Sequence, residues 1–271
     1  MNLTPQHTRD LQAPPPKPPK RKPSARSPWK PEEIPTVLDC LQGRYRVRNQ
    51  AMLAMNLGWG LRVSEDNSLT VGDITHADGS LKDVFVVAPE RLKGGKPRPP
   101  WRPKPYPADH VHGCMCSKCG GQKPPKQTPP IARTLPITPE MRPYLLAWLK
   151  ELRARVGELT PDMPLWLSRK RTQAGAWKAI SRQQHWHIIV EACKVAETKL
   201  EGFSHQDFGS HSARKTVVTV LTDSTGDILI ASRYIGHKGI GVTQAYYKAN
   251  PRRERENVGK MVALILPAVA A

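Results

Sequence analysis

Two proline-rich and strongly basic segments limit which parts of this chain can fold. Residues 1–30 hold seven Lys and Arg against one acidic residue (net +6), and residues 91–133 hold ten against one (net +9). Together they carry +15 of the formal +19 of the 271-residue chain. The first segment cannot bury enough apolar surface to offset the entropy of ordering. We therefore expect residues 1–27 to form a disordered basic arm and the core to begin near Pro28.

Elsewhere, apolar residues recur mainly with helical spacing. Two runs of β-branched character, 82–88 and 131–137, instead predict the strands of one hairpin. The expected fold class is mainly α with a small β-hairpin or sheet (α+β). The predicted helices lie around Val37 to Leu41, at 51–57 with an end at Gly58 or Gly60, and at about 139–156, 181–199, 211–222 and 226–235.

Several positions in these helices are expected to be buried. Cys40 and Cys193 fall in helical patterns, where a buried cysteine with a free thiol is the usual state. In the last two predicted helices, apolar side chains recur at helical spacing and are expected in the core. These are Val217, Val220, Leu221, Ile228, Ala231 and Ile235.

The strong positive charge indicates a polyanion as the large partner, although each basic run is also compatible with an ordinary solvated surface. The N-terminus lacks the apolar region of a signal peptide. The longest apolar run, 261–271, is far shorter than the roughly 20 residues that span a bilayer. We expect a cytoplasmic protein that does not enter a membrane.

Four short motifs place candidate functional residues in a fixed order. Arg62 lies in Gly-Leu-Arg-Val-Ser-Glu, and His211 and Arg214 are three residues apart, on one face of a predicted helix. His237 follows a glycine, and Tyr246 comes nine positions later. A guanidinium matches two phosphate oxygens at once, and a phenol beside imidazoles and cations suits nucleophilic attack on a phosphodiester. The series therefore indicates chemistry on a phosphodiester.

This ordered series resembles the tyrosine recombinase (phage integrase) family over roughly residues 28–260. The resemblance implies a tyrosine recombinase catalytic domain at 28–271, with a long insertion at 97–130 and a C-terminal tail at 251–271. The family also has a catalytic lysine in the β-hairpin. Lys93 matches it best, with Lys96 as the alternative because the insertion follows directly.

The resemblance implies site-specific DNA recombination without metal or ATP. Tyr246 would attack the scissile phosphate and form a 3′-phosphotyrosyl link, with Tyr247 as the competing nucleophile. Arg62 and Arg214 would stabilise the transition state. Lys93 would protonate the leaving oxygen, His211 would assist proton removal from the tyrosine, and His237 would hydrogen-bond the phosphate. The alternatives are a non-catalytic DNA-binding protein with this fold and a type IB topoisomerase-like enzyme.

The insertion carries a cluster of metal-ligating residue types. A tetrahedral zinc site could be built from them, although the spacing differs from a double Cys-x-x-Cys knuckle. The alternatives are reduced thiols without metal and a redox role. Catalysis itself would need no cofactor. The candidate ligands of a structural zinc are His110, His112, Cys114, Cys116 and Cys119.

The resemblance also implies partners. Typical members carry a separate helical core-binding domain before the catalytic domain, and here only the basic arm precedes it. The chain thus resembles a catalytic-domain-only member on double-stranded DNA, with the arm, the insertion or an accessory DNA-bending or clamp-supplying protein as the replacement. The apolar tail, 251–271, would dock either into a neighbouring protomer of a homotetramer on DNA or onto its own domain.

Overall fold

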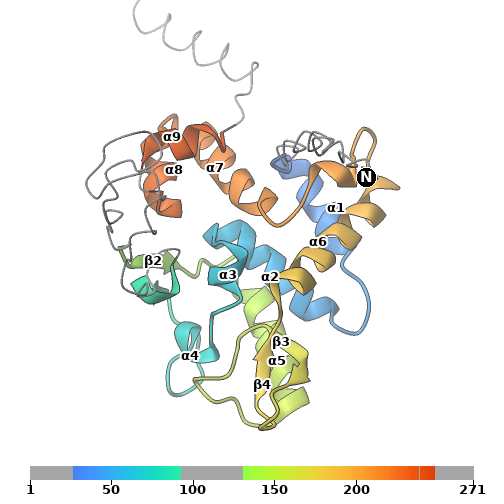
Figure 1. The fold of residues 1–271 in the computed structure, drawn as a ribbon, viewed down its shortest axis with the longest axis vertical. Coiled ribbons are helices and arrows are strands. Elements are labelled where there is room, and N and C mark those ends of the chain that lie inside the picture. The colour runs from blue at the N-terminus through green and yellow to red at the C-terminus, as the bar shows by residue number, and fades with distance from the viewer. Residues whose placement is uncertain (1–26, 93–130, 238, 248–271) are drawn as a thin grey trace, which may run out of the picture.

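The computed structural model describes residues 27–92, 131–237 and 239–247. The predicted basic arm apart from Ser27, the insertion and the C-terminal tail lie outside these residues. Within them the fold is mainly helical with two small hairpins, as Figure 1 shows. The expected α+β class is therefore confirmed.

The first part of the described chain is built around one long helix, α2. It packs against α5 on one side and α7 on another, so it lies at the centre of the molecule (Figure 1). It ends because Gly60 adopts the left-handed conformation, with φ of 57°, that terminates helices. The elements here are η1 (Pro31–Glu33), α1 (Ile34–Asp39), α2 (Arg46–Trp59), α3 (Val63–Asp66) and α4 (Val71–Ile74).

The predicted hairpin is present. Strand β1 (Val84–Val87) pairs antiparallel with β2 (Arg133–Pro136), with Val87 opposite Arg133. A second hairpin, β3 (Leu167–Arg171) with β4 (Trp177–Ala179), was not predicted. Its strands are short and mostly exposed, and they lack the run of β-branched residues by which the first hairpin was predicted.

The short helix Ile240–Gln244 was not predicted, whereas the other four helices described after the first hairpin lie close to their predicted positions. Ser181 and Asp227 begin two of them, since each side chain accepts a hydrogen bond from a backbone N–H of the first turn. None of the helices in the described ranges is long and apolar enough to cross a membrane. The helices and the 3₁₀ turn are α5 (Arg142–Val156), α6 (Arg182–Glu197), η3 (His205–Asp207), α7 (Ser212–Thr225), α8 (Ile228–Ile235) and α9 (Ile240–Gln244).

The core confirms most of the predicted buried positions. Val217, Ala231 and Ile235 join α7 to α8, and Cys40 and Cys193 are buried with free thiols. The prediction that Val220 is buried is wrong, because this residue is 39% exposed. It lines an outward-facing apolar hollow between η1, α1 and α7 instead of the core. Leu221 and Ile228 are only partly buried.

Candidate active site

Arg62 lies in the short connection between the end of α2 and the start of α3. Helix α2 stops at Trp59, and Arg62 takes an extended conformation as the residue before α3. Its Nη1 donates to Oε1 of Glu65 at 2.8 Å, and its backbone N–H donates to Oε2 of the same carboxylate at 2.9 Å. The Arg62 side chain keeps 24% of its surface exposed. Glu65 therefore fixes the guanidinium of Arg62 while leaving it open to a ligand.

Arg214, on the first turn of α7, is 1% exposed. Its Nη1 donates to the carbonyl of Gly60 and its Nη2 to the carbonyl of Ile235, both at 2.6 Å. Burial, and then the nearby charges of Arg62 and Arg133, lower the pKa of Arg214 to about 9. It still carries its charge at neutral pH, with its guanidinium held by two helix ends.

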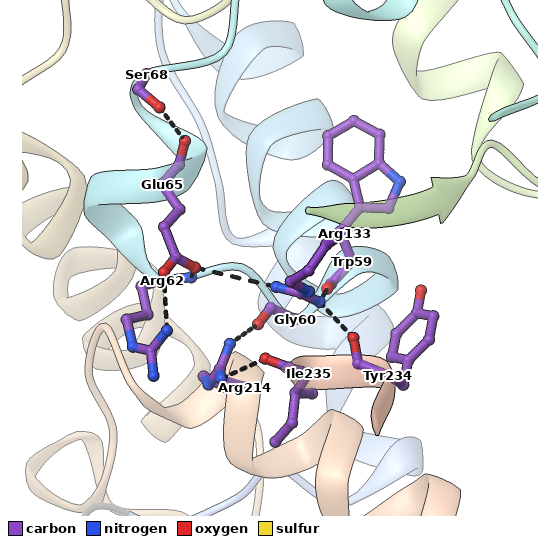
Figure 2. Close-up of polar contacts among 9 residues, drawn as sticks. All are labelled: Trp59, Gly60, Arg62, Glu65, Ser68, Arg133, Arg214, Tyr234 and Ile235. Carbon is purple, nitrogen blue, oxygen red and sulfur yellow. Dashed lines mark hydrogen bonds and ion pairs between the residues drawn. The ribbon is translucent and has the colours of Figure 1, made fainter. Parts of the chain in front are cut away.

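Arg133, in β2, is a buried cation that sequence reasoning missed. Its Nη2 donates to the carbonyls of Trp59 at 3.0 Å and Tyr234 at 2.6 Å, and its Nη1 lies 4.0 Å from Oε2 of Glu65 (Figure 2). The signal was present in the alternation of the strand, which sends Arg133 and Leu135 to the same buried face. A charged residue at a core-facing strand position needs partners, so it deserved the status of a candidate site residue.

Glu65 is the buried carboxylate between these arginines. It belongs to the Arg62 motif, although we predicted no separate role for it from the sequence. Burial alone would raise its pKa, but hydrogen bonds from Arg62 and the charges of Arg62 and Arg214 bring that pKa below its ordinary value. Glu65 is therefore ionised and offsets part of the positive charge of three guanidiniums, leaving the cluster cationic.

The two histidines meet the predicted nucleophile at one end of this cluster. The ring centre of Tyr246 lies 5.1 Å from that of His237 and 6.5 Å from that of His211. His237 holds its orientation through Nδ1, which is 2.9 Å from the hydroxyl of Thr243 in α9. Within the described residues, Nε2 of His237 is buried without a hydrogen-bond partner. That nitrogen has the capacity to form a hydrogen bond with a ligand.

Both imidazoles are neutral at neutral pH. Burial, followed by the charges of Arg214 and Arg62, lowers the pKa of His237 to about 4. The same causes, in the same order, lower the pKa of His211 below its ordinary value. A neutral imidazole can accept a proton, so His211, at the exposed start of α7, has the protonation state that a general base needs.

The two adjacent tyrosines face different partners. Tyr247 donates its hydroxyl to Oδ1 of Asp223, in the last turn of α7, at 3.0 Å. Tyr246 instead has His237 at its ring, and Nζ of Lys215 lies 5.9 Å from its ring centre. The geometry thus favours Tyr246 over Tyr247 as the residue of the arginine and histidine cluster.

The structure brings together five of the six predicted catalytic residues, namely Arg62, His211, Arg214, His237 and Tyr246. The sixth, Lys93, lies outside the described residues, as does its alternative Lys96. The same holds for the five candidate zinc ligands of the insertion, so zinc binding stays a prediction. Elsewhere, the part of the chain that the structure describes holds no group of three or more His, Cys, Asp or Glu suited to a metal ion.

Residues 131–253 match the sequence model of the phage integrase family. This range holds four of the five clustered residues and Arg133, and Arg62 lies before it. None of the curated proteins is similar enough in sequence to match this chain.

Several solved structures share the fold. The chain is 16% identical to XerA recombinase, with a TM-score of 0.55, over 89% of this chain and 66% of that one. It is 20% identical to the Tn1549 transposon integrase in complex with circular intermediate DNA, with a TM-score of 0.53, over 86% and 66%. The XerH site-specific recombinase bound to difH in a post-cleavage complex is 14% identical, with a TM-score of 0.50, over 89% and 54%. The chain thus spans only about half the length of XerH.

Proposed function

Because this chain carries a phage integrase family domain and has the fold of a tyrosine recombinase catalytic domain, we propose that it is a site-specific DNA recombinase. It would cleave and rejoin double-stranded DNA through a 3′-phosphotyrosyl intermediate. The comparisons support recombination in general, since XerH and the Tn1549 integrase are described in complexes with DNA. The chemistry assigned below to individual residues is our proposal.

One observation carries the proposal: a phenol, two neutral imidazoles and two fixed guanidiniums gather from separate parts of the chain. Tyr246 lies against His237 and His211. The charges of Arg62 and Arg214 are close enough to both histidines to lower their pKa values. A nucleophile, proton acceptors and cations in one place are what transesterification at a phosphodiester requires.

In the cleavage step, the hydroxyl oxygen of Tyr246 attacks the scissile phosphorus. Its proton passes to neutral His211, a bond forms between phosphorus and the tyrosine oxygen, and the bond to the 5′-oxygen breaks. Lys93 gives a proton to that departing oxygen. In the rejoining step, a 5′-hydroxyl of the partner strand gives its proton to Lys93 and attacks the phosphotyrosine. The bond from phosphorus to the tyrosine oxygen breaks, and Tyr246 takes back the proton that His211 held. The phosphodiester energy is kept in the covalent link, so neither metal nor ATP is needed.

Fixed charge stabilises the pentacoordinate transition state in this scheme. Arg62 and Arg214 face the additional negative charge with guanidiniums already held by Glu65 and by two backbone carbonyls. Such groups need no reorganisation as charge develops, which is why they are effective. Nε2 of His237 donates a hydrogen bond to a phosphate oxygen when Thr243 donates its hydroxyl to Nδ1.

The basic segments 1–30 and 91–133 would bind the DNA backbone, which makes affinity fall steeply with salt. We further propose a catalytic domain at 28–271 whose apolar tail, 251–271, joins protomers into a tetramer on DNA. An accessory DNA-bending or clamp-supplying protein is a further proposed partner. We also propose a structural zinc in the insertion. The proposed location of the protein is the cytoplasm.

Covalent trapping tests the proposal. The protein is incubated without metal with nicked duplexes that tile the DNA flanking its own gene, and products are resolved in SDS. We expect an SDS-resistant, protease-sensitive adduct that disappears in Tyr246→Phe and persists in Tyr247→Phe. Salt-sensitive binding without an adduct on any duplex would contradict the proposal and favour a non-catalytic DNA-binding protein. Relaxation of supercoiled DNA without sequence preference would favour a topoisomerase-like enzyme.

A further inference from the structure

We infer that Arg133 is a positioning residue of the proposed active site. It holds together the ends of α2 and α8, which are followed shortly by Arg62 and His237. This inference rests on the proposed function, because it assigns the residue to the same reaction. Arg133 lies in β2, far in sequence from both helix ends, and its side chain is 6% exposed.

Arg133 and Arg214 make parallel bridges between α2 and α8. Arg133 joins the carbonyls of Trp59 and Tyr234, and Arg214 joins those of the next residues, Gly60 and Ile235 (Figure 2). The carbonyls at a helix C-terminus lack helical partners and carry partial negative charge, so a cation stabilises them. Two guanidiniums therefore bind the ends of α2 and α8 to each other.

These two ends lead directly into functional residues. After Trp59 the chain runs through Gly60 to Arg62, and after Ile235 it runs through Gly236 to His237. The aliphatic part of the Arg133 side chain also packs against the backbone at Gly236. A Cβ placed on Gly236 would lie 2.9 Å from Cδ of Arg133, and Gly236 has a positive φ of 66°. Arg133 thus limits both the separation of the helix ends and the path of the chain into His237.

Arg133 also contributes to the balance of charge around Glu65. Its Nη1 is 4.0 Å from Oε2 of Glu65, the oxygen that accepts the backbone N–H of Arg62. The carboxylate of Glu65 is therefore held between Arg62 and Arg133. Since the guanidinium of Arg133 is buried behind the helix ends, we assign it no contact with DNA, in contrast to the partly exposed Arg62.

The test separates positioning from general stability and from DNA binding. Single-turnover cleavage at saturating DNA, and the Kd for the same nicked duplex, are measured for the full chain with Arg133→Met and Arg133→Lys. The control is Arg48→Met. Arg48 is 2% exposed and donates to the carbonyl of Leu167 at 2.6 Å, but it lies about 16 Å along α2 from Trp59. All rates are taken below the melting temperature of each variant.

We expect Arg133→Met to cleave about 100-fold more slowly with Kd nearly unchanged, since small displacements of reacting groups cost factors of this size. Arg133→Lys should lose less, yet remain slower than the wild type, because an ammonium lacks the planar fork that reaches two carbonyls. Arg48→Met should cleave at the wild-type rate. Should Arg133→Met fail to fold, Arg133→Lys decides the matter.

Three results would overturn the inference. The first is a wild-type cleavage rate in a folded Arg133 variant, the second is an equal loss in Arg48→Met, and the third is a weakened Kd with an unchanged rate at saturation. Imidazole ¹⁵N NMR adds a readout that needs no cleavage. The nitrogens of His237 should shift toward those of a free imidazole in Arg133→Met but not in Arg48→Met. If the wild type forms no adduct, the proposed function fails, and the NMR comparison still tests whether Arg133 positions His237.

Discussion

Two consecutive acidic residues of α3, Glu65 and Asp66, are equally buried and yet differ in charge. Both have 0% of their surface exposed. Glu65 points into the arginine cluster, where burial is outweighed by hydrogen bonds and charges from arginine, and its pKa lies below the ordinary value. Burial raises the pKa of Asp66 to about 7. Neighbours one residue apart thus have opposite preferences for the charged state.

The surroundings of Asp66 explain its behaviour. Its Oδ2 accepts a hydrogen bond from Nδ2 of Asn56 at 2.7 Å and lies 3.9 Å from Nδ1 of His185. Burial lowers the pKa of His185 to about 3, and its Nδ1 lies 2.8 Å from Oδ1 of Asn67. Although the distance is short enough for an ion pair, both groups are neutral between those two pKa values. We therefore regard this cluster as a neutral hydrogen-bonded network.

The contrast distinguishes a site from its scaffold. On one side of α3, fixed cations exceed the single carboxylate, so an anionic ligand would complete the charge balance. On the other side, Asp66 and His185 favour their neutral forms, and Asn56 and Asn67 hydrogen-bond to them. Glu65 keeps its charge because it holds nearby arginines in place. Cations fixed in this way are the arrangement expected around a phosphate.

Removing the charge of Glu65 should have the largest effect. Glu65→Gln leaves two buried guanidiniums and Arg62 without their counter-charge, and breaking such a buried pair costs about 3–5 kcal/mol in the free energy of unfolding. Denaturant unfolding at pH 7 measures it, with Asp66→Asn as the matched control. A loss below about 1 kcal/mol would show that Glu65 does not hold the cluster together.

Removing one cation should slow the proposed reaction. Arg214→Gln should reduce the rate of adduct formation by about 10²–10³-fold, the factor typical for loss of one fixed donor at a developing anion. The matched control is Arg142→Gln, because Arg142 instead pairs with Asp83 beside the first hairpin and donates to the carbonyl of Lys82. A decrease below about tenfold, in a folded Arg214 variant, would contradict the role assigned to this cation.

The raised pKa of Asp66 should make the free energy of unfolding depend on pH. With a pKa near 7 instead of 3.8, folded Asp66 binds a proton that the unfolded chain lacks between those values. This contribution to stability is therefore full at low pH and is lost as pH rises through 7. Relative to Asp66→Asn, the wild type should lose about 2 kcal/mol of unfolding free energy between pH 5 and 7. Parallel stability curves for the two proteins would show that Asp66 is ionised throughout.

The smallest effect is expected at the second tyrosine. Tyr247→Phe removes the hydrogen bond to Asp223 and should cost about 1 kcal/mol of stability. Adduct formation should persist, because the Tyr247 hydroxyl is directed to α7 and not to the histidines. Thermal unfolding and the trapping assay measure the two effects. Loss of the adduct in Tyr247→Phe alone would exchange the roles of the two tyrosines.

The sequence was most informative where chemistry depends on residue type and spacing. Arg62, His211 and Arg214 could be chosen because guanidinium and imidazole groups in ordered motifs match a phosphate, and the first hairpin followed from its β-branched residues. Gly60 marks the end of α2, where a left-handed conformation favours glycine. These local rules and the order of the motifs were sufficient to predict the α+β class and five of the residues that gather in the candidate site, but not the roles of Glu65 and Arg133.

The sequence was least informative where long-range contacts decide. Arg133 gains its importance from carbonyls 74 and 101 residues away, and no local pattern specifies those partners. The difference between Glu65 and Asp66 likewise depends on which elements pack against each side of α3. Val220 has the spacing of a core residue, but its side of α7 faces a hollow.

Identification of the modified residue tests the central claim most directly. The covalent adduct is trapped on a nicked duplex, digested with nuclease and protease, and the peptide that contains both Tyr246 and Tyr247 is fragmented in a mass spectrometer. We predict a 3′-linked nucleotide phosphate on Tyr246 alone. A nucleotide on Tyr247, on another residue, or on no residue despite stable DNA binding would contradict the assignment of this cluster as the active site.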